Sequence, residues 1–333
     1  MLAINKHIAA ICLLAASGCA GEVRIPGTAP ETDAPRELPD GAEAWSFLGD
    51  PLSPAPPSDA VRAVYEANLE EASATFEATP QDADALIWYG RRLAYLGQYR
   101  DAIDVFTEGV ALHPEDARMV RHRGHRYVSV RELDLAIADF RTAADLVRGL
   151  EDDIEPDGIP NARGIPTSTL HFNIWYHLGL AHYLAGDFEL ALEAWNECLS
   201  VSRHLDSVVA TTYWLNNTLR RLGRTEEAEE LLIDLPAADE IIESTAYLDV
   251  LLLHTGEQTA ENLVGPMGDD ATLGSTTTAY GVAVWHLVNG RGDTAFRMFE
   301  AILENRSQWP AFGYIAAEAE VARMNGAPVG GGD

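Results

Sequence analysis

The sequence predicts an all-α fold, a helix-turn-helix solenoid, from one repeated spacing. Small and aromatic residues recur 34 positions later, and again in a third copy, with the same internal offsets of 7, 12 and 16 residues. A fixed period of about 34 residues is typical of arrays in which each unit is a pair of antiparallel helices. The copies are Gly90, Gly97, Ala102 and Phe106; Gly124, Arg131, Ala136 and Phe140; and Gly179, Gly186, Ala191 and Trp195.

Each position in the repeat has a packing role. The first and third residues are small because a larger side chain would push the paired helices apart. Glycine at the second position favours the left-handed conformation that ends a helix, but Arg131 takes its place in the second copy. Weaker copies are expected at Gly223 with Ala228, Gly256 with Ala260, and Gly290 with Ala295.

Single helices are expected to cap both ends of the array. Residues 59–79 predict a helix that covers the first unit, and residues 309–323 predict a closing helix with a polar outer face. The chain is 47% apolar, which suffices for a continuous core, and no strand-like alternation competes with the helical pattern. The solenoid is therefore predicted for 59–324, followed by a disordered tail at 325–333.

The three clear copies resemble the tetratricopeptide repeat (TPR) family. The resemblance covers about residues 59–323, with specific motifs in three units. It implies a right-handed TPR-type solenoid that serves as a non-enzymatic protein–protein interaction scaffold, and it does not identify the partner.

The first residues carry an export pattern. Lys6 precedes an apolar run at 8–16 that is too short to span a membrane. The following Ala16-Ser17-Gly18-Cys19 resembles the lipobox of bacterial lipoproteins. This resemblance implies a signal peptide at 1–18, lipidation of Cys19 and a place at the periplasmic face of the outer membrane. The alternative is ordinary cleavage after Ala20, which would give a soluble periplasmic or secreted protein.

A proline-rich stretch, 19–58, is expected to be an extended tether between the anchor and the solenoid. Trp45, Phe47 and Leu48 inside it suggest either a docking motif or a flap that lies on the first repeat. A second irregular stretch, 149–168, interrupts the repeat period with an acidic run and then a Pro/Gly-rich run.

The formal net charge is −29, and Lys6 is the only lysine. Such a surface repels nucleic acid and anionic headgroups, so nucleic-acid partners are excluded and the membrane link is expected only through the lipid. Cys198 has no partner for a disulfide once Cys12 is cleaved off and Cys19 is acylated, and it is expected to be buried.

The ligand-facing positions of the first helices differ from this acidic background. They are rich in arginine, histidine, asparagine and aromatic residues, which suit an acidic or C-terminal peptide segment of an envelope protein. The alternative is that the arginines pair with acids of the same chain and the aromatics fill the inside of the array. The predicted peptide-binding groove comprises Trp88, Arg91, Tyr95, Arg121, His122, His125, Asn173, Tyr176, His177, Tyr183, Tyr213, Asn217, Arg220 and Arg221.

The acidic insertion is itself a candidate occupant of the groove. Its five acids, between Glu151 and Asp157, have the charge to fold onto Arg121 and Arg220 and regulate access. The alternative is a solvated loop. A calcium loop is disfavoured because the acids lack the required alternating order.

Two further functions are weighed against a groove-binding adaptor. One is a structural assembly factor that acts through convex or terminal helices. The other is a metal or hydrolytic site built from His122, His125 and His177, which is disfavoured because the neighbouring Arg121, Arg123 and Arg126 repel a cation. No cofactor is expected.

Overall fold

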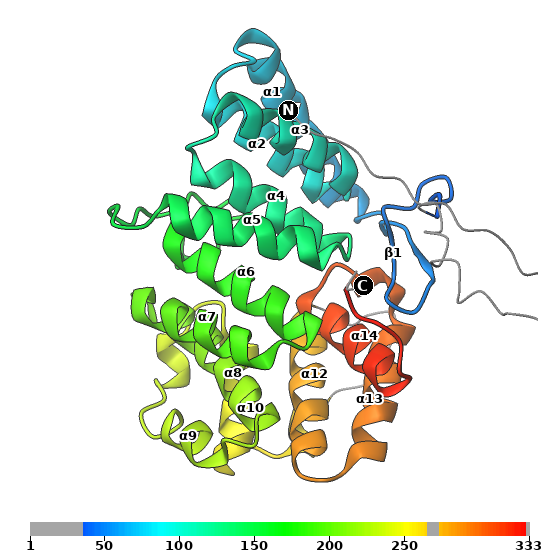
Figure 1. Cartoon of the computed structure of the whole chain (residues 1–333), viewed down its shortest axis with the longest axis vertical. Coiled ribbons are helices and arrows are strands. Elements are labelled where there is room, and N and C mark those ends of the chain that lie inside the picture. Colours follow the sequence, from blue (N-terminus) through cyan, green and yellow to red (C-terminus); the bar gives the residue numbers. More distant parts are fainter. Residues whose placement is uncertain (1–35, 265–272, 331–333) are drawn as a thin grey trace, which may run out of the picture. The chain divides into compact units, whose positions relative to one another are not determined.

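The computed structural model describes residues 36–264 and 273–330 (Figure 1). The helices that it describes all belong to the part of the chain from residue 38 onward. Within the described residues, no helix combines the length and the apolar content needed to cross a bilayer. The predicted signal peptide and Cys19 lie outside the described residues.

The predicted all-α solenoid is confirmed, because consecutive helices pair along the chain. The helices are α1 (Asp59–Ala78), α2 (Ala83–Tyr95), α3 (Tyr99–Leu112), α4 (Ala117–Ser129), α5 (Leu133–Leu146), α6 (Leu170–Ala185), α7 (Phe188–Val201), α8 (Leu205–Arg221), α9 (Thr225–Glu230), η1 (Ala238–Glu240), α10 (Thr245–Thr255), α11 (Ala260–Leu263), α12 (Leu273–Val288), α13 (Gly292–Glu304), η2 (Arg306–Gln308) and α14 (Phe312–Met324).

Each clear unit is held by an aromatic ring that lies directly on a glycine. A Cβ added to Gly90 would meet the ring of Phe106 at 2.6 Å, and one added to Gly179 would meet Trp195 at 2.6 Å. The corresponding distance from Gly124 to Phe140 is 3.0 Å. The period in the sequence therefore reports the contact that sets the distance between the paired helices.

Left-handed residues end the first helix of each unit. The glycines at these turns have φ between 74° and 92°, as predicted. Arg131 adopts the same conformation with φ 69°, which is unfavourable for a side chain with a Cβ. Its guanidinium is buried and donates to the carbonyls of Ser129 (2.7 Å) and Trp309 (2.9 Å) and to the carboxylate of Glu318 (2.9 Å). These bonds offset the backbone strain.

The closing helix differs from its prediction. The polar outer face expected for α14 is wrong, because all residues from Gly313 to Ala322 are buried. The helix packs on α12, α13 and α6 (Figure 1). Its two buried carboxylates are both paired, Glu318 with Arg131 and Glu320 with Arg221 and Arg323. The array therefore does not end with a solvated helix.

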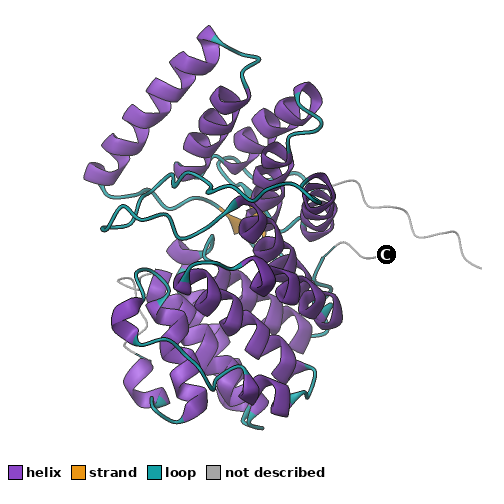
Figure 2. Cartoon of the chain, turned by 90° about the vertical axis from the view of Figure 1, so that its left-hand side faces the viewer, coloured by secondary structure: helices purple, strands orange, loops and turns teal. Residues whose placement is uncertain are grey.

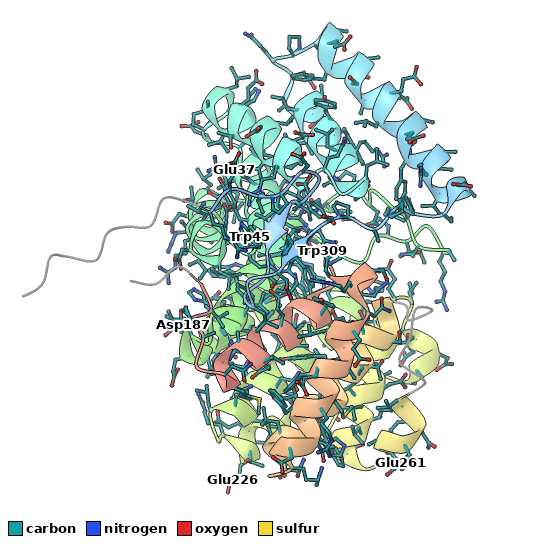
Figure 3. All side chains as sticks on the ribbon, turned by 90° about the vertical axis from the view of Figure 1, so that its right-hand side faces the viewer. Glu37, Trp45, Asp187, Glu226, Glu261 and Trp309 are labelled. Carbon is teal, nitrogen blue, oxygen red and sulfur yellow. The ribbon has the colours of Figure 1, made fainter. Side chains whose placement is uncertain are left out.

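The extended tether predicted for 19–58 is wrong for its described part. A short hairpin of β1 (Ala44–Trp45) and β2 (Pro51–Leu52) packs on the helices, with Ala44 and Leu52 buried. The amide of Phe47 donates to Glu318 at 2.7 Å. The indole of Trp309, which is labelled in Figure 3, donates to the Ser53 carbonyl at 3.0 Å. These contacts fix the segment against α14, which the proline content did not reveal.

The ring-on-glycine contact predicts the effect of a single methyl group. Gly179→Ala is expected to destabilise the protein by about 1–3 kcal/mol, because its Cβ would collide with a ring that is fully buried. Gly292→Ala is the matched control, since that helical glycine has open space around it and no positive φ. We expect it to be neutral or stabilising in urea unfolding. Equal losses for the two variants would contradict the packing argument.

Candidate functional site

The candidate site lies where the insertion meets the first helices of three units. Residues 147–169 connect α5 to α6 without a helix, along the side seen in Figure 2. The return end of this loop is fixed: the amide of Leu170 donates to the Asp153 carbonyl at 2.9 Å, and the hydroxyl of Thr169 donates to Asp152 at 2.7 Å. The preceding acidic segment is thereby held beside α4 and α6.

Glu155 is the one acid of this segment that is buried, with 7% of its surface exposed. Its carboxylate lies 3.3 Å from Nε of Arg121, accepts a hydrogen bond from Nε2 of His122 at 3.1 Å, and accepts one from the amide of Asn173 at 2.8 Å. The predicted contact of an insertion acid with Arg121 is therefore present. Arg220 donates a hydrogen bond to Asn216 instead, at 3.1 Å, so the predicted contact between the insertion and Arg220 is wrong.

The backbone of the insertion is held as well. Arg91 donates to the carbonyl of Pro156 at 2.9 Å, and Arg92 donates to that of Gly158 at 3.1 Å. A Cβ on Gly158 would lie 1.7 Å from the hydroxyl of Tyr95, so a larger residue here would require the side chain of Tyr95 to move. One carboxylate and two carbonyls are thus recognised, which is how an extended peptide is bound.

Burial and charge set the protonation of this cluster. Burial alone would raise the pKa of Glu155, but Arg121, His122 and Arg91 outweigh it, and the pKa lies well below its usual value. Burial, reinforced by the charge of Arg121, lowers the pKa of His122 to about 3. We assign its neutral ring a proton on Nε2, because Nδ1 accepts from Arg121 at 2.8 Å. Glu155 is therefore ionised and His122 neutral at pH 7.

The rest of the predicted groove is not an open surface. The physical reason is that α10, α12 and α14 fold back over α6 and α8, which a local repeat pattern cannot reveal. The hydroxyl of Tyr176 meets that of Tyr247 at 3.0 Å, and the hydroxyl of Tyr280 donates to that of Tyr183 at 2.9 Å. The groove prediction is corrected here for Tyr176, Tyr183, Tyr213 and Asn217, which are buried, and for Arg221, which pairs with Glu320.

The remaining predicted residues lie at the edges of the site. Trp88 is half-buried beneath Arg91, whose guanidinium carbon is 4.4 Å from the ring centre. The rings of His125 and His177 lie 4.4 Å apart, and both contact Phe312 of α14. Sequence reasoning missed Arg92 and Arg126, although both lie on the same helices as the predicted arginines.

The histidines serve the packing of the site. Both ring nitrogens of His122 are engaged, and Nδ1 of His177 meets the carbonyl of Asn173 at 2.6 Å. In the described part of the chain, no three His, Cys, Asp or Glu side chains are grouped so as to hold a metal ion. Cys198 is buried and free, and burial raises the pKa of its thiol to about 12.

Buried neutral histidines predict that the protein loses stability in acid. Burial lowers the pKa of His122, His177 and His254 to about 3, against about 6.5 in an unfolded chain. The unfolded chain therefore binds more protons below pH 6.5. The free energy of unfolding, which is at its full value above that pH, should fall by up to about 1.4 kcal/mol per pH unit for each histidine.

Urea unfolding between pH 7.5 and 4.5 measures this slope. His254→Leu should reduce the slope of the unfolding free energy against pH by up to about 1.4 kcal/mol per pH unit, the contribution of one proton. The reason is that Nε2 of His254 is buried without a hydrogen-bond partner in the described structure. An unchanged slope in this variant would contradict the assignment.

Comparison with known proteins identifies one repeat unit of the chain. Residues 172–204, which span α6 and α7, match the tetratricopeptide repeat family. No curated protein matches the chain significantly. The match covers the unit in which Trp195 lies on Gly179, and the same contact recurs in the units of Gly90 and Gly124.

Several solved structures are similar to the chain. The crystal structure of MamA is 17% identical with a TM-score of 0.40, over 52% of this chain and 86% of that one. YrrB, a TPR protein with an unusual peptide-binding site, is 13% identical with a TM-score of 0.41, over 76% and 98%. The TPR-like repeats of a putative kinesin light chain from Podosopora anserina are 14% identical with a TM-score of 0.41, over 69% and 97%. Residues 172–204 therefore form a unit that matches the tetratricopeptide repeat, and the units of Gly90 and Gly124 are built with the same ring-on-glycine contact.

Proposed function

We propose that the protein is a lipid-anchored periplasmic adaptor that binds an acidic, extended segment of a protein partner in the cell envelope. The binding site comprises Arg91, Arg92, Arg121, His122 and Asn173, named here the arginine site. One observation carries the proposal: this site already holds an acidic, extended segment of its own chain. The chemistry that fits Glu155 and the following carbonyls also fits a partner of the same kind.

The insertion then acts as an internal competitor. Because the insertion belongs to the same chain, its effective concentration at the site is about millimolar, the range typical of a short flexible linker. A partner must therefore displace the insertion in order to bind. Only one carboxylate, Glu155, is bound deeply, while Glu151 and Asp153 remain exposed. The insertion is therefore a moderate ligand that a longer or better matched segment can replace. The recognition of carbonyls explains why the partner is expected to be extended rather than helical.

A peptide copied from the insertion tests the arginine site. The probe is fluorescently labelled Glu-Asp-Asp-Ile-Glu-Pro-Asp-Gly, residues 151–158. Gly158→Ala should release the internal segment without any change of charge, because its Cβ collides with Tyr95. We expect the Gly158→Ala protein to bind the probe at least about 10-fold more tightly than the unchanged protein in fluorescence anisotropy.

Two controls make this test specific. Glu151→Ala removes an exposed acid of the same insertion and should leave probe affinity unchanged, whereas Glu155→Ala should raise it. Arg121→Gln in the Gly158→Ala background should abolish binding. Binding that survives Arg121→Gln in a folded protein would move recognition away from this site. Capture from envelope extract with the same two proteins would then identify the partner.

The anchor is proposed from the pattern around Cys19. Cys19→Ala should abolish incorporation of labelled fatty acid and release the protein from the membrane fraction, because the acyl chain is the expected membrane link. Cys12→Ala is the matched control, since this cysteine lies inside the signal-peptide pattern and should leave both readouts unchanged. Membrane association that persists without fatty acid on Cys19 would count against a lipoprotein.

A further inference from the structure

A small cavity lies beneath the arginine site, between α2 and α4. Its volume is about 140 Å³, which gives room for several water-sized groups and excludes a large ligand such as a nucleotide. Glu155 contacts two of the residues that line it, Arg121 and His122. The polar residues of its lining are Arg91, Tyr95, Arg121, His122, His125 and Arg126.

The charges around this cavity do not balance. Three guanidinium groups, those of Arg91, Arg121 and Arg126, line it, and Glu155 is in contact with that of Arg121. Arg91 interacts electrostatically with Glu155 and Asp157. The two histidines add no charge, since burial holds the pKa of each far below neutrality. Among the described residues, Arg126 is therefore left without a carboxylate partner, in a protein whose formal net charge is −29.

Arg126 is the clearest sign of a missing anion. Its guanidinium carbon lies 5.3 Å from the ring centre of Tyr99, and no ion pair joins it to any residue of 36–264 or 273–330. Burial lowers its pKa to about 10, with Arg121 and Arg91 contributing repulsion. By surface exposure Arg126 is half-buried. Two other arginines differ from it: Arg131, which is buried, and Arg221, which is half-buried, each pair with a carboxylate of α14. A desolvated charge without a partner is costly, so a counter-charge is expected.

Arg121 adds a second donor to the same space. Its Nε is buried and makes no hydrogen bond within the described structure, because the Glu155 oxygen at 3.3 Å satisfies the distance of an ion pair without the alignment of a hydrogen bond. Donors on Arg121 and Arg126 thus face one cavity from the same helix, α4. Paired guanidiniums of this kind suit the oxygens of a carboxylate or phosphate.

We propose that this cavity binds one small oxyanion, held by Arg126 and Arg121 beneath Glu155. The oxyanion is a free phosphate or small carboxylate, or the terminal carboxylate of a peptide chain. This inference goes beyond the proposed function, because Arg126 takes no part in holding the insertion. Arg126→Gln, which removes the oxyanion site but no residue of the arginine site, would leave the binding of the residue 151–158 probe intact.

Thermal unfolding of the full mature chain tests the site. Phosphate is titrated against chloride at constant ionic strength, and glycylglycine is compared with its amide as a probe for a chain terminus. A melting temperature about 3 °C higher is expected when the free oxyanion is at ten times its Kd. Arg126→Gln should remove this shift. Arg148→Gln, which removes an exposed arginine with the same change of charge, should keep it.

The outcomes separate the two sources. A shift with phosphate that Arg126→Gln abolishes identifies a free oxyanion. A shift only with glycylglycine, and not with its amide, identifies a chain terminus. No shift with either probe, or equal shifts in Arg126→Gln and the unchanged protein, overturns the proposal. The melting temperature of Arg126→Gln without added oxyanion should be no lower than that of the unchanged protein, which verifies that the variant is folded.

Discussion

The structure depends on the close contact between an aromatic ring and a helical glycine. In three units this contact brings the two helices together at a fixed distance, and it repeats with the period of the sequence. Because each pair is built alike, the first helices α2, α4 and α6 present equivalent positions side by side. Helices α4 and α6 provide Arg121 and Asn173, which bind the carboxylate of Glu155. Helix α2 provides Arg91, which binds the carbonyl of the following residue. A packing constraint thus creates the binding geometry.

The same site illustrates how an acidic protein holds an acidic segment of its own chain. Long-range repulsion would keep an acidic partner away, so recognition must come from short contacts inside a desolvated site. Burial of Arg121 and Glu155 provides those contacts, and Asn173 adds a neutral donor that carries no charge to be repelled. Specificity then depends on the position of one carboxylate rather than on overall charge.

The sequence predicts the repeating features well and the long-range ones poorly. Periodicity predicts the helix pairs and the turns at Gly97 and Gly186, because both depend on residues a few positions apart. The charge of the insertion suggests a contact with Arg121 as one of two alternatives, without showing that Glu155 is the acid involved. The burial of Tyr183 and the fixed hairpin escape prediction, since the first involves Tyr280 of α12 and the second Glu318 of α14, 97 and 271 positions away in the sequence. Local patterns carry no information about such closure.

The bond between Arg131 and Glu318 has a consequence for how stability is distributed along the chain. The two residues are 187 positions apart, and Arg131 occupies a strained turn that its buried partners make favourable. In an ordinary repeat array each unit contacts only its neighbours. Here the second clear unit also depends on α14, so loss of that helix would weaken a turn far away in the sequence.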